Sequence, residues 1–338
     1  MQKAALIIGV DWYEDQLTAP FDHAGTDARA LAACLTEPCG FDEVLLLAGG
    51  EEEPPPGLYR ARDALEELRA GLGADDLFLF GFFGHCVERD GEGYLLLHDS
   101  RQAHPAGNSL ALKSLRQHFE SLECKQRVLL LDSFRNAPQT WRRDADNRLS
   151  VAVAASLADL IRPAPGDRRT RDALLNSVRA GGRSYALPEK GRGVFASYLI
   201  DVLESFSSAG RDIELKEVAE AVISEIRRWS LTNPRTGSPQ IPWFEEAGAV
   251  GPIFLKNVQS RRSNEREGGA LDAGPGLPES PDAGSPSLQI TLPPVPGDLQ
   301  DVQRRLEEIA SEIRSVVNCE DPAVRSLAEK VRLLEDRR

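Results

Sequence analysis

The feature that most constrains the fold is a series of short, almost continuous apolar runs separated by amphipathic stretches. Lys3 to Val10 is the first run, and it is too uniformly apolar for a strand with one face in water. Strands buried on both faces have this composition, and they occur in parallel sheets covered by helices. Similar runs follow at Asp42 to Ala48, Asp76 to Phe83 and Arg127 to Leu131.

Helical patterns lie between these runs. In Tyr59 to Leu72, for example, Ala61, Leu65 and Leu68 recur at a spacing of three or four residues. Strands that alternate with helices build βαβ units, so the sequence predicts an α/β fold, a three-layer α/β/α sandwich around a mostly parallel sheet. We also expect helices at 26–35, 110–122, 151–161, 194–206 and 215–231, a strand at 173–178 and a hairpin at 87–97.

The composition changes near the end of the globular pattern, and this change predicts three parts. The first is a folded domain at 1–257. Residues 268–297 contain seven Pro and six Gly, so 258–297 is expected to be a flexible linker. Residues 298–338 are expected to form a helical hairpin or coiled-coil docking module, because apolar residues recur there at a 3-4-3-4-3 spacing: Leu299, Val302, Leu306, Ile309, Ile313 and Val316.

The charge and the cysteines exclude several classes of protein. A formal net charge of −13 repels a phosphate backbone, so no nucleic-acid partner is expected. No signal peptide and no run of about 20 apolar residues is visible, so we expect a cytoplasmic protein without a membrane span. The five scattered cysteines contain no C-x-x-C pair and are interpreted as reduced thiols, and the histidines show no metal-ligand spacing. Neither a metal nor another cofactor is expected.

The candidate chemistry lies at the ends of two of the predicted strands. One strand runs into Gly84-His85-Cys86, and the next runs into Asp132-Ser133-Phe134. In an open parallel sheet the active site lies at the carboxyl ends of the strands. These two segments are therefore expected to lie next to each other.

The order of these motifs resembles the prokaryotic branch of the caspase-like peptidases, over roughly residues 3–256. In that pattern a strand ends in Gly-His, a hairpin carries Asp-Gly-x-Gly-Tyr-Leu-Leu as at 90–96, and a later strand ends in Asp-x-Cys-Arg-Asn. His85 and position 134 are 49 residues apart, in agreement with the spacing of about 50 in caspases. Shorter matches are Leu6 to Val10, Thr26-Asp27-Ala28 and Gly182-Arg183-Ser184-Tyr185.

The resemblance implies a caspase-like fold and a dyad that is no longer complete. It places His85 at the imidazole of the family and Phe134 at the cysteine nucleophile. Catalysis requires a thiolate that attacks the scissile carbonyl, and a phenyl ring has no nucleophilic atom and occupies more space than a thiol. We therefore expect an inactive member of the family.

An active cysteine or serine endopeptidase that cuts after basic residues is the alternative, with Cys86 or Ser133 as a non-standard nucleophile. Neighbouring residues of a strand point to opposite faces, so both side chains are expected to diverge from His85. A nucleotide-binding domain is not favoured, because no glycine-rich phosphate-binding motif follows a predicted strand.

Three residues are candidates for binding. In relatives that cut after Arg or Lys, an aspartate at the position of Asp132 lines the primary specificity pocket; the alternative is that this carboxylate only caps a neighbouring loop. Ser184 and Tyr185 match the strand that pairs with the substrate backbone. The arginine that gives animal caspases their aspartate preference corresponds to Ala186, so no aspartate-specific pocket is expected.

These assignments predict a pseudoprotease that acts as a regulatory or scaffolding subunit. Its expected partner is a protein, with an active caspase-like protease as the candidate, because related proteins pair through an edge strand. A homodimer through the C-terminal helices is the other option. The arginine-rich segment 141–171 would suit cleavage by a protease that cuts after basic residues.

Overall fold

The computed structural model describes the greater part of the folded domain. The chain divides into two units, Met1–Leu271 and Asp272–Arg338, and all of the described residues belong to the first. The predicted linker at 258–297, the docking module at 298–338 and Phe134 lie outside the described residues, as do 141–147 and 164–169 of the segment 141–171. The structure describes residues 1–16, 18–50, 53–133, 148–163, 170–233, 238–249 and 251–257.

A six-stranded sheet forms the centre of the domain, with the strand order β12-β8-β7-β3-β1-β2. Within this sheet β1, β2, β3, β7 and β8 pair in parallel. The edge strand β12 runs antiparallel to β8. The sheet is therefore mostly parallel, as predicted. Its strands are β1 (Lys3–Gly9), β2 (Glu43–Leu47), β3 (Leu77–Phe83), β7 (Gln126–Asp132), β8 (Arg171–Asn176) and β12 (Trp243–Gly248).

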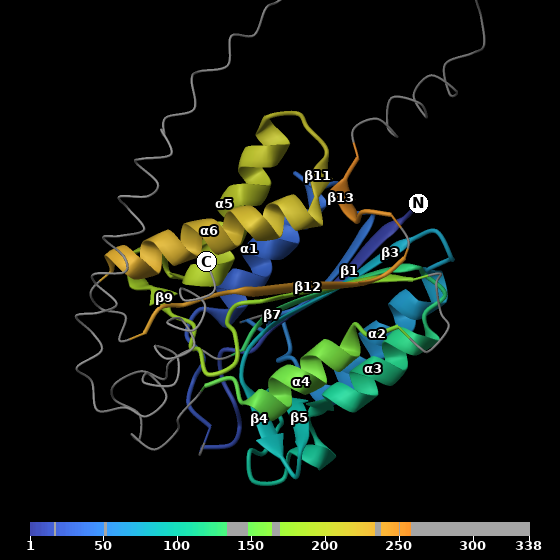
Figure 1. Cartoon of the computed structure of the whole chain (residues 1–338). Helices are drawn as coiled ribbons and strands as arrows, with labels where there is room; N and C mark the ends of the chain where they lie inside the picture. The colour runs from blue at the N-terminus through green and yellow to red at the C-terminus, as the bar shows by residue number, and fades with distance from the viewer. Residues whose placement is uncertain are drawn as a thin grey trace, which may run out of the picture. The chain divides into compact units, whose positions relative to one another are not determined.

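Helices cover both faces of this sheet, which confirms the three-layer α/β/α sandwich (Figure 1). One layer contains α1 (Ala24–Thr36), α5 (Val194–Ser208) and α6 (Leu215–Thr232). The other contains α2 (Leu58–Gly71), α3 (Leu112–Ser121) and α4 (Val151–Leu160).

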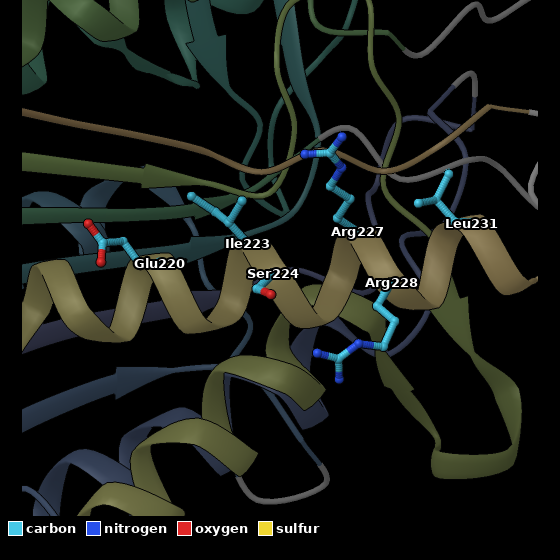
Figure 2. A pocket seen from close by; sticks show the side chains of 6 residues that line it. All are labelled: Glu220, Ile223, Ser224, Arg227, Arg228 and Leu231. Atoms are coloured by element: carbon cyan, nitrogen blue, oxygen red, sulfur yellow. The ribbon is translucent and has the colours of Figure 1, made fainter. Parts of the chain in front are cut away.

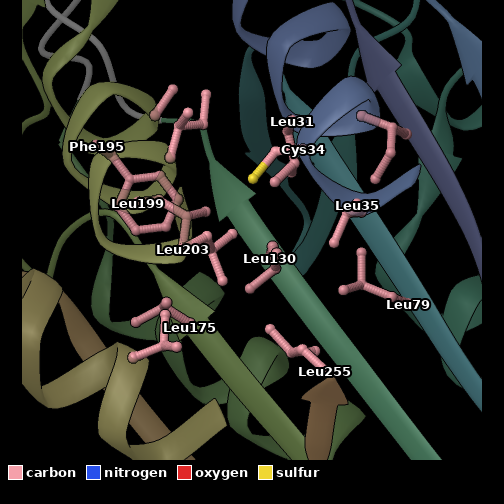
Figure 3. Close-up of a cluster of buried hydrophobic side chains, with 14 of the residues drawn as sticks. Leu31, Cys34, Leu35, Leu79, Leu130, Leu175, Phe195, Leu199, Leu203 and Leu255 are labelled. Carbon is pink, nitrogen blue, oxygen red and sulfur yellow. The ribbon is translucent and has the colours of Figure 1, made fainter. Parts of the chain in front are cut away.

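The alternation of side chains along each strand explains why both layers form. In β3, Leu79 and Phe83 pack against α1 and α5, whereas Phe78, Phe80 and Phe82 pack against the opposite layer. Each side chain is fully buried, and burial of a large apolar side chain stabilises the fold by about 1.5 to 3 kcal/mol. Figure 3 shows the first cluster between the sheet, α1 and α5.

The shorter elements correct the predicted boundaries. The hairpin consists of β4 (Cys86–Arg89) and β5 (Glu92–Leu95), and its turn has positive φ at Asp90 and Gly91, as a type I′ turn requires. The predicted helix at 110–122 begins only at Leu112, because β6 (Leu110–Ala111) pairs with β5. The other short elements are β9 (Ala186–Leu187), β10 (Arg192–Gly193), β11 (Ile213–Glu214), β13 (Phe254–Lys256) and the 3-10 turns Pro105–Gly107 and Pro188–Lys190.

The N-terminus of α1 is fixed against two other elements. Gly9 ends β1 so close to the helix that a Cβ there would lie 2.5 Å from the carbonyl oxygen of Ala24. The fully buried carboxylate of Asp27 accepts a hydrogen bond from the N–H of Gly193 at 2.9 Å. This contact joins the first turn of α1 to the start of α5. None of the described helices is both long enough and apolar enough to cross a membrane.

The opposite end of the sheet contains a buried ion pair between neighbouring strands. Arg127 in β7 and Asp172 in β8 form two parallel hydrogen bonds, of 2.6 Å from Nε and 2.7 Å from Nη2. Their side chains are only 7% and 1% exposed. Arg127 also donates to the carbonyl of Phe119 at the end of α3, so one guanidinium joins three elements.

We predict that Asp172→Ala destabilises the domain by about 3 to 5 kcal/mol, because the substitution leaves a buried guanidinium without its carboxylate. Urea denaturation measures this free energy of unfolding. Asp201→Ala is the matched control, since its ion pair with Lys190 is half exposed and is worth at most about 1 kcal/mol. Equal effects of the two substitutions would contradict the assignment.

Candidate functional site

The site is built where the pairing of β3 with β7 continues beyond the strand ends. Phe83 is the register partner of Asp132, and the next backbone contact is Gly84 N–H to the Asp132 carbonyl at 3.2 Å. The N–H of Cys86 then faces the carbonyl of Ser133 at 3.4 Å. The structure therefore brings the Gly-His segment and the Asp-Ser segment together, as predicted from the carboxyl-end rule.

His85 is buried, and three residues of the loop between β1 and α1 surround it. The hydroxyl of Tyr13 accepts a hydrogen bond from the His85 backbone N–H at 2.8 Å, and the two rings lie 5.3 Å apart. The ring of Phe21 meets the imidazole edge-on at 5.1 Å. The imidazole Nε2 lies 2.9 Å from the carbonyl oxygen of Ala19.

The Ala19 contact determines which nitrogen of His85 can act as a base. A backbone carbonyl can only accept a hydrogen bond, so Nε2 must carry the proton in this contact. The neutral imidazole is then the Nε2–H tautomer, and Nδ1 is the nitrogen that takes up a proton. This is the arrangement that a histidine needs when one nitrogen is oriented by a hydrogen bond and the other accepts a proton from a nucleophile.

Asp132 lies on the face of the sheet that carries α1 and α5. Its carboxylate is fully buried, and its register partner in β3, Phe83, points to the same face. The pairing of β7 with β8 continues through Ser177, whose N–H donates to the Leu131 carbonyl at 2.8 Å. This register places the buried Ser177 beside Asp132 on the same face. The Ser177 hydroxyl makes no hydrogen bond within the described residues.

Ser184 and Tyr185 lie in the short segment that leads into β9, and a glutamine connects this segment to the sheet. The buried Gln240 accepts from the Tyr185 N–H at 3.0 Å and donates to the Ser177 carbonyl at 3.1 Å. The Tyr185 carbonyl accepts from Val194 at 2.9 Å. Because backbone groups alternate along an extended chain, those of Ser184 and Ala186 point to the opposite edge.

The two alternative nucleophiles have surroundings that suit structural roles. Cys86 packs in the cluster with α2 and α3, on the opposite side from Phe21, and burial raises the pKa of its thiol to about 12. A thiol with such a pKa is protonated at neutral pH, and the thiolate is the nucleophile. The hydroxyl of Ser133 is fully buried and makes no hydrogen bond to His85 or to another described residue.

Within the described residues no group of three or more His, Cys, Asp and Glu side chains is arranged to hold a metal ion. The shallow pocket along α6 is a separate feature: Arg227 and Arg228 point to opposite sides of that helix (Figure 2). None of the anticipated site residues lines it. Its lining residues are Glu220, Ile223, Ser224, Arg227, Arg228 and Leu231.

Sequence reasoning missed five contributors to the site. Two of them act through groups without a sequence signature, the Ala19 carbonyl and the edge-on ring of Phe21. Only Ser177 had a positional signal, because it lies at the carboxyl end of the strand predicted at 173–178. The others are Tyr13 and Gln240.

No protein-family model matches this chain, and no curated protein matches it. Among solved structures, a Geobacter sulfurreducens protein determined as a structural-genomics target is similar, with a TM-score of 0.51 and 15% identity over 76% of this chain and 97% of its own. The Drosophila initiator caspase Dronc has a TM-score of 0.46 and 12% identity over 75% of this chain and 82% of its own. At 15% identity the first similarity concerns the fold alone.

We predict that Tyr13→Phe lowers the free energy of unfolding by about 1 kcal/mol, because it removes the acceptor of the His85 N–H. Urea denaturation with tryptophan fluorescence measures the change. Tyr59→Phe is the control, since Tyr59 is 78% exposed and its hydroxyl loss should change stability by less than about 0.5 kcal/mol. Tyr13→Phe behaving like this control would contradict the proposed hydrogen bond.

Proposed function

We propose that this chain is a catalytically inactive caspase-like protein, a pseudoprotease, that binds extended peptide and acts as a regulatory or scaffolding subunit. The observation that carries the proposal is Phe134. It stands two residues after Asp132, where the resemblance to caspase-like peptidases places the cysteine nucleophile. A phenyl ring cannot attack a carbonyl, so the hydrolytic step has no nucleophile at this position.

The surroundings of His85 support a site that lost its nucleophile and kept its base. Ala19 and Tyr13 hold the imidazole and its backbone, with the proton on Nε2 and the basic lone pair on Nδ1. The resemblance pairs this histidine with position 134, so a thiol there would have the base that the family's chemistry requires. The proposal therefore predicts that one substitution can restore chemistry.

Two features support peptide binding. Asp132 provides a buried carboxylate with the Ser177 hydroxyl beside it, a combination that can accept hydrogen bonds from a guanidinium or ammonium group. The segment around Ser184 directs alternate backbone groups toward one edge, and an extended peptide pairs with such an edge by β-strand addition. The favoured ligand is an extended segment with an Arg or Lys side chain that pairs with Asp132.

A protein partner is the natural source of such a segment, and we propose an active caspase-like protease as that partner. β12 offers a second contact, because it is one of the two edge strands of the described sheet and pairs there with β8 alone. Edge strands present backbone groups to which another chain can add. Pairing through an edge strand in related proteins is the analogy behind this choice.

The alternative function is an active endopeptidase that uses Cys86 or Ser133. The raised thiol pKa of Cys86 and its position in the opposite cluster argue against the first. The buried Ser133 hydroxyl makes no hydrogen bond to the imidazole that would have to activate it, which argues against the second. Labelling of the unaltered protein by a thiol-reactive peptide ketone, blocked by His85→Ala, would favour this alternative.

We predict that the unaltered protein does not cleave a library of peptides with basic residues, and that Phe134→Cys cleaves it after Arg or Lys. The substitution restores a thiol at the position that the resemblance pairs with His85. Mass spectrometry of the products identifies the cleavage positions. Adding His85→Ala to Phe134→Cys should lower the rate by about 10²- to 10⁴-fold, the usual contribution of general acid–base catalysis.

Phe134→Ala is the matched control, because it removes the ring without adding a nucleophile. Cleavage by this variant or by the unaltered protein would show that the nucleophile lies elsewhere. Absence of cleavage by a Phe134→Cys protein that still unfolds cooperatively would also contradict the proposal.

A further inference from the structure

The C-terminal turn of α1 brings two cysteines together. The helix ends at Thr36, and the N–H of Cys39 donates to the carbonyl of Cys34 at 3.1 Å. This hydrogen bond closes a six-residue turn at the C-terminus of the helix. Pro38 lies inside the turn, where it cannot continue the helix.

Both cysteines are buried in the cluster between α1, α5 and the sheet. They are free thiols, with 3% of Cys34 and 1% of Cys39 exposed. Figure 3 shows the sulfur of Cys34 beside Leu31, pointing into this cluster. The backbone hydrogen bond between them and their burial in the same cluster bring the two thiols close together.

Two lysines are held near Cys39. The Lys3 ammonium donates to the carbonyls of Cys39 at 2.7 Å and Leu255 at 2.9 Å. The Lys256 ammonium donates to the Ser207 hydroxyl at 2.8 Å, and that hydroxyl donates to the Pro38 carbonyl at 3.0 Å. The start of β1, the end of α5 and β13 thus converge on one turn and place positive charge beside it.

These contacts shift the pKa values of the two thiols in opposite directions. The hydrogen bond from Cys34, with the charges of Lys3 and Lys256, lowers the pKa of Cys39 although burial opposes this effect. The same hydrogen bond, followed by burial, raises the pKa of Cys34. Cys39 is therefore the more acidic thiol of the two, and the thiol that ionises more readily is the one that attacks an oxidant while the other resolves.

We propose that Cys34 and Cys39 form a redox modification site, which a two-electron oxidant of the peroxide class converts to an intramolecular disulfide. In the first step the Cys39 sulfur attacks one oxygen of hydrogen peroxide; an S–O bond forms, the O–O bond breaks, and a sulfenic acid and hydroxide result. In the second step the Cys34 sulfur attacks the Cys39 sulfur, an S–S bond forms and the S–O bond breaks. The hydroxide released from the S–O bond takes the Cys34 proton and becomes water. The hydroxide of the first step becomes water with the proton that the Cys39 thiol lost. One peroxide and two thiols thus give one disulfide and two waters.

The turn also gives the oxidant a way in. Thr36 and Glu37, which lie between the two cysteines in this turn, are exposed. Opening of a helix terminus requires less free energy than opening of the core strands. The other described cysteines differ, because burial raises the thiol pKa of both Cys86 and Cys124 to about 12.

The test treats the folded full-length protein with hydrogen peroxide and then alkylates all remaining thiols in denaturant without a reductant. Peptide mapping by mass spectrometry should find the Cys34–Cys39 disulfide, a mass lower by two hydrogen atoms, and three of the five cysteines alkylated. Cys39→Ser and Cys34→Ser should each abolish the disulfide. Cys124→Ser, the matched control, should form it to the same extent as the unaltered protein.

Three results would overturn the proposal. They are five alkylated cysteines after treatment, a disulfide that involves a different cysteine, and conversion of Cys39 to a sulfinic acid without a disulfide. The measurement uses no peptide ligand and does not depend on proteolysis by this protein. Its outcome is therefore independent of the function proposed for His85 and Asp132.

Discussion

The pairing of β3 with β7 is the constraint on which the site depends. Its parallel register ends with Phe83 opposite Asp132, and the continued contacts of Gly84 and Cys86 carry the two chains past the strand ends together. His85 is therefore delivered to the edge where Asp132 emerges, although the two are 47 positions apart in sequence. The loop from β1 then closes over the imidazole, because β1 is the neighbour of β3 on its other side.

Most of the fold could be predicted because the sheet is buried on both faces. The strands β1, β3 and β7 are nearly continuous apolar runs, and their helices have apolar stripes, so both signals are strong. β12 was not predicted for the opposite reason: Trp243 to Gly248 is a half-exposed edge strand with two glutamates and no continuous apolar run. Similarly, Leu110 and Ala111 fit a helical pattern, and only their pairing with β5 removes them from the helix.

The sequence identifies candidate site residues, but it does not identify the residues that contact them. His85, Asp132 and Ser184 could be selected because strand ends and motif spacing are visible in sequence. The residues that orient them act over long sequence distances: Ala19 contributes a backbone carbonyl, and Gln240 lies 55 positions after the Tyr185 that it contacts. Cys34 and Cys39 were interpreted as unrelated thiols, because their five-residue separation has meaning only where a helix ends between them.

The central claim is that a buried carboxylate still recognises a basic side chain on a chain that does not cut. Isothermal titration of the unaltered protein with an extended peptide ending in arginine, and with the same peptide ending in uncharged citrulline, tests it directly. The account predicts that the arginine peptide binds at least about tenfold more tightly and that Asp132→Asn removes this difference. Equal affinity for both peptides, or binding of neither, would contradict it.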